Sequence, residues 1–355
     1  MEIKRIQDEN LEGKSIIMRV DFNVSIEDGK VQDRYKIESC AETVKYILSQ
    51  KNTKLALISH LGRPQDSKMD MDDGFLKKFS FRQIVSEIEE IIGVKVVFIP
   101  GYGKDLIKKE LGEVGENGGV LLLENVRFFS EEEENDESFS RELASNFDIY
   151  VNEAFSNSHR AHSSMVGLPE VLPGYAGFQF QKELNNLDKI KFHPEHPAVA
   201  IIGGAKIKTK LPLIESFSNN YEYVLVGGMV ANEAIDTMID FSDRVVLPFD
   251  FAKNRLDIGP QTISRFKDII NQAETIVWNG PLGKFEESPY DVGTREIVDA
   301  IMSSEAFTVA GGGESIQVLE RLGVMDKFSF ISTGGGAMLK YLSGEDMPGL
   351  NKLLK

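Results

Sequence analysis

Short apolar runs alternate along the chain with amphipathic stretches of helix length. Gly or polar residues bound each run, a pattern typical of parallel strands covered by helices. The sequence therefore predicts the α/β class with mainly parallel sheets. The expected strands of the first half are Ser15–Val20, Lys54–Ser59, Lys95–Ile99, Val120–Leu123 and Asp148–Val151. Those of the second half are Ala198–Ile202, Tyr223–Val226, Arg244–Leu247, Thr275–Val277, Phe307–Val309 and Phe328–Ile331.

The segment Gly167–Gly177 separates the two sets of strands. Pro169, Pro173 and three glycines interrupt the periodicity there, and a helical stretch follows at Gln179–Lys191. A chain of 355 residues is long enough for two domains at about 150 residues each. We therefore place the domain boundary in this segment.

Charge and cysteine content narrow the class of protein. The chain has 40 Lys and Arg against 56 Asp and Glu, a net charge of −16, which argues against broad binding to nucleic acid or an anionic membrane. Cys40 is the single cysteine, so the chain has neither an internal disulfide nor a multi-cysteine metal site. The N-terminus lacks the apolar run of a signal peptide, and no apolar stretch reaches the roughly 18 residues that span a bilayer. We expect a cytoplasmic protein. The acidic run Glu131–Glu134 is interpreted as a solvated loop or helix start without a functional role.

Basic residues follow the strands of the first half. They occur in Arg19–Asn23, Ser59–Pro64, Glu124–Arg127 and Ser158–His162. Ligands of doubly wound sheets bind outside the carboxyl ends of the strands, and guanidinium groups bind phosphate or carboxylate through paired hydrogen bonds. One such arginine is more often a surface ion-pair partner, but four strand ends together predict a site for a small polyanion.

Three of the five histidines, His60, His159 and His162, lie in these segments and admit a metal site. Arginines accompany each of them and would repel a cation. Contacts with an anion or local hydrogen bonds are the favoured interpretation.

Glycines follow the strands of the second half, in Gly203–Lys206, Gly227–Met229, Gly311–Ser315 and Gly334–Gly336. Glycines between a strand and a helix let backbone N–H groups approach phosphate oxygens, and the helix N-terminus favours an anion. One such junction is more often a tight turn, whereas four predict a nucleotide or phosphate site. The chain lacks the P-loop, dinucleotide and protein-kinase motifs. The turn-rich segment Trp278–Glu286 carries a carboxylate suited to a ribose, or it is a structural turn.

An anion-binding edge in one domain and a phosphate-binding edge in the other suggest phosphoryl transfer between two separately held ligands. Closure of the domains would bring the charge-neutralising groups together and exclude water.

The motifs are specific enough for a family resemblance. Arg19–Asn23 (RVDFN), Ser59–Pro64 (SHLGRP), Leu123–Phe128 (LENVRF), His159–Gly167 (HRAHSSMVG), Gly203–Lys206 (GGAK), Trp278–Gly283 (WNGPLG) and Ser332–Gly336 (STGGG) occur in one order. The chain resembles phosphoglycerate kinases from end to end. The resemblance implies two Rossmann-like three-layer α/β/α domains joined by a hinge helix, and a reversible, Mg²⁺-dependent phosphoryl transfer between ATP and 3-phosphoglycerate in glycolysis or gluconeogenesis. It also implies a monomer.

The resemblance implies the following division of the chain. Residues 1–168 bind 3-phosphoglycerate, 169–191 form the hinge segment and interdomain helix, 192–336 bind the nucleotide, and 337–355 return to the N-terminal domain. The expected 3-phosphoglycerate contacts are Asp21, Asn23, Lys36, His60, Arg63, Arg127 and Arg160. The expected nucleotide contacts are Gly204, Ala205, Lys206, Lys210, Gly227, Gly228, Asn279, Pro281, Gly283, Glu286, Gly312, Gly313, Glu314 and Ser315. Lys36, Lys206, Gly312 and Gly335 are the expected catalytic positions, and Glu314 is the residue expected at the Mg²⁺ that arrives with ATP.

Several positions depart from the family pattern. Lys36 stands where the family usually carries its catalytic arginine, and Arg34 is a second candidate for that charge. Thr209 and Glu314 replace acids of the family, and the interval between Asn232 and Asp257 is shorter than in most members, where the missing segment helps to wall the adenine pocket. Two alternatives to an active kinase stay open: a homologue that binds both ligands with weak or lost turnover, and a kinase for another phosphorylated or carboxylated acid.

Overall fold

The computed structural model describes residues 2–66 and 72–355 of the chain. They form two compact units, one from Met1–Lys182 with Met347–Lys355 and the other from Glu183–Asp346. The helix α9 (Phe178–Phe192) begins in the first unit and ends in the second.

The first unit contains a six-stranded parallel sheet in the order β5-β6-β4-β1-β7-β8. Its strands are β1 (Ser15–Arg19), β4 (Lys54–Ile58), β5 (Val96–Ile99), β6 (Val120–Leu123), β7 (Ile149–Asn152) and β8 (Gly174–Ala176). Alternate strand residues face opposite sides, so that Ile16 and Met18 enter one core and Ile17 enters the other. A short hairpin, β2 (Ile26–Glu27) and β3 (Lys30–Val31), lies outside this sheet.

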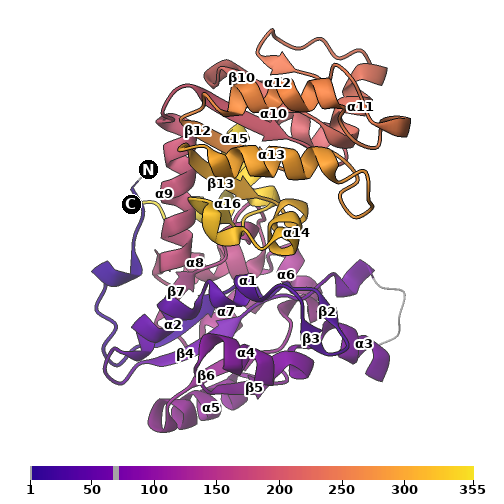
Figure 1. Cartoon of the computed structure of the whole chain (residues 1–355). Coiled ribbons are helices and arrows are strands. Elements are labelled where there is room, and N and C mark those ends of the chain that lie inside the picture. The colour runs from indigo at the N-terminus through magenta and orange to yellow at the C-terminus, as the bar shows by residue number, and fades with distance from the viewer. Residues whose placement is uncertain (1, 67–71) are drawn as a thin grey trace. The chain divides into compact units, whose positions relative to one another are not determined.

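Helices cover both faces of the first sheet (Figure 1). One face packs against α1 (Arg34–Glu38), α2 (Ala41–Leu48) and α4 (Val85–Ile92), and the other against α5 (Lys104–Asn117), α7 (Glu137–Ala144) and α8 (Leu168–Val171). The remaining helices of this unit are α3 (Asp73–Phe79), α6 (Ser130–Glu134) and α16 (Pro348–Asn351). The sheet covered by helices that the periodicity predicts is therefore present, in the three-layer arrangement that the family resemblance implies.

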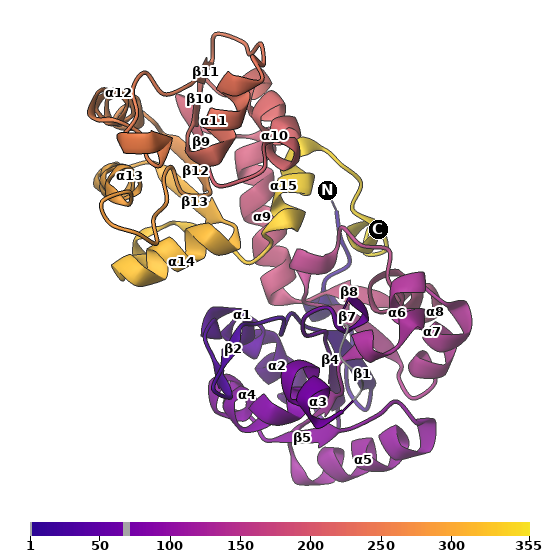
Figure 2. The same cartoon turned by 90° about the vertical axis from the view of Figure 1, so that its right-hand side faces the viewer.

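The second unit contains its own six-stranded parallel sheet, in the order β11-β10-β9-β12-β13-β14. Its strands are β9 (Ala198–Ile202), β10 (Tyr223–Val226), β11 (Val245–Val246), β12 (Thr275–Asn279), β13 (Phe307–Gly311) and β14 (Phe330–Ser332). Its helices are α10 (Ile207–Asn220), α11 (Gly228–Asp236), α12 (Pro260–Ile270), α13 (Val292–Ser303), α14 (Gly313–Leu322) and α15 (Gly336–Ser343). In Figure 2, α12 and α13 lie on one side of this sheet and α10 on the other. The predicted class, two parallel-sheet α/β domains, is confirmed.

The strand order fixes where ligands can bind in each unit. In the first sheet, the strands that follow β1 are added on one side of it, and β7 and β8 lie on the other side. In the second sheet, the order in which strands are added switches sides in the same way between β9 and β12. The loops that follow such neighbouring strands diverge to opposite faces and leave a crevice at the carboxyl edge. Both crevices receive the motifs singled out from the sequence.

The expected strands all occur: three have the expected bounds, and the ends of the others are shifted by one or two residues. The sequence prediction missed β8, which lies inside the Pro- and Gly-rich segment taken as an interruption. It is a three-residue edge strand that pairs through Tyr175 with Val151 of β7.

The last residues of the chain belong to the first unit. Ile3 forms an antiparallel bridge with Leu354, and the Lys355 N–H donates to the carbonyl oxygen of Glu2 at 3.1 Å. In contrast, α15 lies in the second unit, where it packs on α10. The segment that returns to the first unit thus begins at Met347.

A buried carboxylate caps the start of α9. Glu153 follows β7 and accepts hydrogen bonds from the Gln179 N–H at 3.0 Å, the Phe180 N–H at 3.3 Å and the Thr43 hydroxyl. Burial raises the pKa of Glu153 to about 7, although these three donors oppose the shift.

Candidate active site

Arg19 and His60 form the centre of the basic edge in the first unit. Both side chains are buried, and Arg19 Nη2 lies 3.0 Å from His60 Nδ1, while Arg19 Nε donates to Ser164 Oγ at 2.9 Å. Burial and then the charges of Arg19, Arg127 and Arg160 hold the pKa of His60 well below its ordinary value. Since an arginine can only donate, Nδ1 of the neutral ring accepts from it, and Nε2 carries the proton. His60 is therefore a hydrogen-bond donor without charge.

Arg127 and Arg160 converge on the same edge from different loops. Arg127 is buried, donates from Nη1 to the Gly62 carbonyl at 2.7 Å, and lies 3.1 Å through Nε from Glu133. Burial and the charges of Arg160 and Arg19 lower the pKa of Arg127 to about 10. Burial and the charge of Arg63 lower the pKa of Arg160 in turn. Guanidinium groups from separate strand ends therefore lie close enough to disfavour one another's charge, as expected for a site that receives an anion.

The loop after β1 is held in place by the residues expected to contact substrate. Asp21 accepts from the Ser156 hydroxyl at 2.6 Å and from the Asn23 N–H at 3.2 Å. Asn23 Oδ1 accepts from the Gly62 N–H at 2.8 Å, which ties this loop to the one after β4. Arg63, next in that loop, is exposed and lies 3.6 Å from Asp66.

Lys36 lies beside this loop, whereas Arg34 does not. Lys36 Nζ donates to the Asn23 carbonyl at 3.0 Å and lies 3.4 Å from Asp33. Arg34 instead pairs with Glu90 of α4 at 3.2 Å. Arg34 and Lys36 are two positions apart in α1, and each position in a helix turns by about 100°, so the two side chains point to roughly opposite sides. The hypothesis that Arg34 supplies the missing arginine is not supported, because its guanidinium is held against α4.

Glu132 does not fit the interpretation of Glu131–Glu134 as a solvated segment. Glu131–Glu134 do form a helix, α6, but Glu132 is fully buried. It accepts from the Ser164 hydroxyl at 2.6 Å and from the Ser164 N–H at 2.8 Å, and lies 3.7 Å from His162. The run is thus not uniformly solvated, because Glu132 anchors the segment after Arg160 beneath the basic edge.

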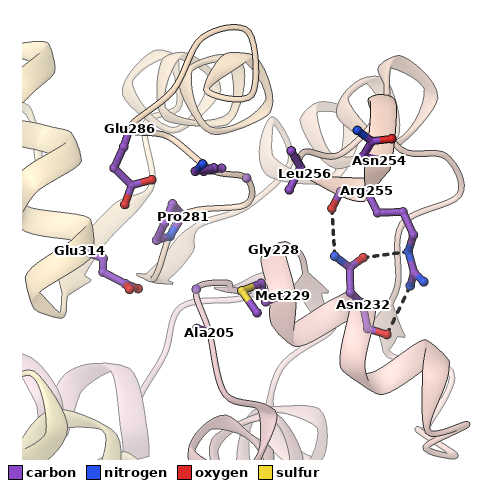
Figure 3. Close-up of a pocket in the computed structure, with 13 residues that line it drawn as sticks. Ala205, Gly228, Met229, Asn232, Asn254, Arg255, Leu256, Pro281, Glu286 and Glu314 are labelled. Carbon is purple, nitrogen blue, oxygen red and sulfur yellow. Dashed lines mark hydrogen bonds between the residues drawn. The ribbon is translucent and has the colours of Figure 1, made fainter.

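Two neighbouring cavities occupy the carboxyl edge of the second sheet. One, of about 530 Å³, is lined by Gly204, Ala205, Gly228, Met229, Asn232, Asn254, Arg255, Leu256, Pro281, Gly283, Lys284, Glu286 and Glu314 (Figure 3). The other, of about 270 Å³, is lined by Lys210, Asn279, Gly280, Gly312, Gly313, Glu314, Ser315, Gly335, Gly336 and Leu339. Glu314 borders both, so the two can hold different parts of one ligand.

The glycines of these loops have two different uses. The N–H groups of Gly203, Gly204 and Gly228 donate to the carbonyls of Asn279, Pro281 and Leu282 at 2.7–2.9 Å. A side chain at Gly203 would lie 2.1 Å from the Pro281 oxygen, so glycine is required there for one loop to lie on the other. Gly204 and Gly228 line the larger cavity, but their N–H groups already donate to these carbonyls.

The starts of α14 and α15 offer N–H groups of another kind. The first N–H groups of a helix have no hydrogen-bond acceptor within that helix. Gly312 precedes α14 with φ +100°, and a side chain at Gly312 would lie 2.8 Å from Asn279 Nδ2. Gly335 precedes α15 with φ +45°. Glu183 of α9 fixes the strand end before Gly335 by accepting from the Ser332 hydroxyl and the Thr333 N–H, each at 2.7 Å. The smaller cavity is thus lined by two helix N-termini suited to phosphate.

Lys206 and Lys210 lie in different surroundings. Lys210 lines the smaller cavity and donates from Nζ to Asn279 Oδ1. Burial lowers the pKa of Lys210 to about 8, although the charge of Glu314 opposes the shift. Lys206 is exposed at the N-cap of α10 with φ +68°. Lys206 lines neither cavity. The Thr209 hydroxyl donates to the Lys206 carbonyl at 2.9 Å.

The sequence analysis missed part of the larger cavity. Met229 and Asn232 come from α11, and Asn254, Arg255 and Leu256 come from the segment before α12. Met229 ends the glycine segment Gly227–Met229, but the other four belong to no motif. The available signal was the short interval between Asn232 and Asp257, whose two ends meet here.

The comparisons with known proteins cover the chain almost completely. The family model for phosphoglycerate kinase matches residues 6–240 and 242–345. The chain belongs to the phosphoglycerate kinase family.

Relatives and solved structures agree with this assignment. Phosphoglycerate kinases of Leptospira biflexa and Rubrobacter xylanophilus are 37% and 38% identical, over 100% and 99% of this chain and 99% and 98% of the relatives. Solved structures of phosphoglycerate kinases from Pyrococcus horikoshii and Coxiella burnetii superpose with TM-scores of 0.85 and 0.82 at 27% identity, and cover 99% of this chain. They cover 98% and 99% of those chains. The family and its class, a phosphotransferase, are confirmed as predicted.

The chain is shorter than its alignment with a relative. The alignment with the Leptospira enzyme is 403 positions long, whereas this chain has 355 residues. The break in the family match falls at residue 241, inside the interval between Asn232 and Asp257. This break lies in the interval that the sequence predicts to be shorter than in most members of the family.

Two properties bear on the wider setting. In the part of the chain that the structure describes, no helix combines the length and apolar character needed to cross a membrane. Within the same residues, no group of three or more His, Cys, Asp or Glu is arranged to hold a metal ion.

Proposed function

We propose that the basic edge of the first unit binds 3-phosphoglycerate and that the two cavities of the second unit bind ATP or ADP. The enzyme then transfers the terminal phosphoryl group of ATP to the carboxylate of 3-phosphoglycerate, and catalyses the reverse. The observation that carries this proposal is the convergence of Arg127, Arg160 and Arg63 on one edge: besides burial, the charge of Arg160 lowers the pKa of Arg127, and the charge of Arg63 lowers the pKa of Arg160. Such repulsion is relieved by a ligand with several negative charges.

In the 3-phosphoglycerate site, the arginines would supply affinity through their charge, and His60 would orient the ligand through a hydrogen bond. Arg63, Arg127 and Arg160 supply guanidinium donors that match phosphate or carboxylate oxygens. His60 adds the Nε2–H donor fixed by Arg19. Asp21 and Asn23 hold the loops that carry these groups, and Lys36 lies beside Asn23.

The nucleotide site would divide between the two cavities. Met229 is 65% exposed at the wall of the larger one, and Leu256 lines the same wall, so both are suited to cover the base. The exposed carboxylate of Glu286 is suited to the ribose hydroxyls. Lys210 and the N-termini of α14 and α15 are suited to the phosphates.

Glu314 is the protein residue suited to Mg²⁺. Its carboxylate borders the cavity assigned to the phosphates, where an unaccompanied acid would repel them. Mg²⁺ is commonly bound by one or two carboxylates together with substrate phosphates, and it neutralises phosphate charge when bound. The single carboxylate therefore fits a metal that arrives with the nucleotide.

Catalysis would rest on positioning and charge neutralisation. A carboxylate oxygen of 3-phosphoglycerate attacks the terminal phosphorus in line, the bond to the bridging oxygen breaks, and ADP leaves. Lys206 and Lys36 would neutralise the equatorial oxygens, and the amides near Gly312 and Gly335 would donate to them. Because the two ligands bind to different units, we propose that hinge-bending closure brings them together and excludes water.

The wider expectations remain proposals. We propose a monomer that works in the cytoplasm in glycolysis or gluconeogenesis and binds neither nucleic acid nor membrane. The net charge of −16 supports the absence of polyanion partners.

The assignment of the two edges is tested by steady-state kinetics with both substrates varied. Arg160→Ala is expected to raise the KM for 3-phosphoglycerate about tenfold or more and leave the KM for MgATP within twofold. Glu286→Gln is expected to do the reverse, with about a threefold to tenfold effect. Equal effects of either change on both KM values would contradict the assignment.

A further inference from the structure

A tight loop forms one wall of the larger cavity. Phe251 and Ile258 form an antiparallel bridge, and the Ala252 N–H donates to the Asp257 carbonyl at 2.9 Å, which closes the loop between them. Asn254, Arg255 and Leu256 occupy its tip and line the cavity.

The backbone of this tip is unusual. Asn254 and Arg255 have φ angles of +62° and +57°. Asparagine tolerates the left-handed region, but arginine seldom adopts it, and such residues persist only where their surroundings hold them. The conformation at Arg255 therefore needs a cause.

The side chain of Arg255 explains this conformation, because it forms hydrogen bonds with α11. Nε donates to Asn232 Oδ1 at 3.1 Å, Nη2 to the Asn232 carbonyl at 3.2 Å, and Nη1 to Asp236 Oδ1 at 2.8 Å. Asn232 Nδ2 donates back to the Arg255 carbonyl at 2.9 Å. The guanidinium also lies over the ring of Phe251, 5.0 Å from its centre. We call these contacts between Arg255 and α11 the Arg255 clasp.

The clasp lies at the end of the cavity away from the phosphates. Figure 3 places Asn232 and Arg255 on one side and Glu286 and Glu314 on the other. The guanidinium would suit a phosphate by its chemistry, but all three of its nitrogens already donate to α11. Arg255 therefore stabilises the wall of the cavity and does not bind the phosphates.

We propose that Arg255 is a positioning residue for the nucleoside part of the nucleotide. The clasp holds Leu256 at the tip of the loop opposite Met229, which shares a face of α11 with Asn232 and Asp236 because these residues are spaced by three and four. The base then packs between two surfaces that are already fixed. This inference rests on the proposed nucleotide site and adds how one wall of that site is kept in place.

The test separates the clasp from the backbone angle. Arg255→Gly removes the side chain but accepts a positive φ without strain, whereas Arg255→Lys keeps a charge for Asp236 and loses the fork that reaches both oxygens of Asn232. Arg295→Ala removes an exposed arginine of α13 in the same unit and serves as the control. For each protein, kcat and both KM values are measured, together with inhibition against MgATP by AMP and by inorganic tripolyphosphate.

We expect Arg255→Gly to raise the KM for MgATP and the Ki of AMP about fivefold to tenfold, with a smaller rise for Arg255→Lys. The Ki of tripolyphosphate, the KM for 3-phosphoglycerate and kcat should stay within twofold, because these depend on other residues. The control should match the parent. A purely structural role would change all of these quantities together.

Three results would overturn the inference. An unchanged Ki of AMP in both variants would show that the clasp does not order the nucleoside wall. A parallel rise in the Ki of tripolyphosphate would show that Arg255 serves the phosphates or the whole fold. Failure of AMP and MgATP to bind the parent protein would remove the proposed nucleotide site itself, and with it this inference.

Discussion

Lys210 of α10 donates a hydrogen bond through Nζ to Oδ1 of Asn279 at the end of β12. The same amide donates from Nδ2 to the Gly311 carbonyl at 2.6 Å, so Asn279 joins a cation to the start of the glycine loop before α14. The amide is thereby oriented, with its oxygen toward the ammonium group. Asn279 thus holds Lys210 at the cavity assigned to the phosphates.

The first prediction concerns the pH dependence of nucleotide use. Burial lowers the pKa of Lys210 to about 8, so the side chain is charged below this pH and neutral above it. Since kcat/KM reports the free enzyme, kcat/KM for MgATP should fall as the pH rises through about 8, approaching tenfold per pH unit. Lys210→Arg keeps its charge and should give a flat profile over this range. An equal fall in both proteins would assign the titration to another group.

Lys36 sets the second prediction. A lysine keeps the charge of the family's arginine but lacks its planar pair of donors. Lys36→Arg should raise kcat by about tenfold, or about 1.4 kcal/mol of barrier, with both KM values within twofold. Arg34→Ala is the control, because Arg34 pairs with Glu90, and it should leave kcat unchanged. A loss of kcat in Arg34→Ala but not in Lys36→Ala would reverse these roles.

A third prediction separates two lysines at the start of α10. Lys206 and Lys208 are both exposed, but only Lys206 belongs to the glycine motif. Lys206→Ala should lower kcat by about 100-fold, since a charge that acts on the transferring group stabilises the transition state more than the bound substrates. Lys208→Ala should change kcat less than twofold. Similar losses in both variants would point to a general effect of charge.

The fourth prediction concerns stability and Glu153. Its pKa is raised from an ordinary 4.5 to about 7 in the folded protein, so folding favours the protonated form. The stabilisation is complete below about pH 4.5 and is lost as the pH rises through 7, by up to about 3 kcal/mol. Glu153→Gln mimics the protonated form and should gain stability relative to the parent between pH 5 and pH 8.

Urea unfolding at both pH values measures the effect of Glu153. Glu142→Gln, which replaces an exposed carboxylate of α7, is the matched control and should show no such gain. If the difference between Glu153→Gln and the parent is the same at pH 5 and pH 8, Glu153 is ionised throughout, and its three donors outweigh its burial.

The sequence predicted the strands well because most of them are buried apolar runs with polar ends. It missed β8, because Pro173 and Gly174 favour a turn and only pairing with β7 makes Gly174–Ala176 a strand. It also misread Glu132, whose partner Ser164 lies in a distant segment. In both cases the deciding contact is made in the tertiary structure and leaves no local pattern.

The site was predictable where chemistry is carried by motifs. The arginine and glycine loops fall at the sheet edges as expected, since strand order dictates their position. The sequence could not separate glycines that permit close packing, such as Gly203, from those that precede open helix N-termini, such as Gly312. The Arg255 clasp was likewise hidden, because Arg255 and Asn232 lie in a region without motifs and meet only after folding.

The return of the chain to its first unit has a consequence for synthesis. Met347, Leu350 and Leu353 are buried there, and the Gly349 N–H donates at 2.9 Å to the carbonyl of Ser158, directly before the loop of His159 and Arg160. A ribosome releases these residues only after the whole second unit has emerged. While the second unit is being synthesised, the first unit therefore lacks a segment of its own core. The loop that bears Arg160 gains this support only after the second unit has been made.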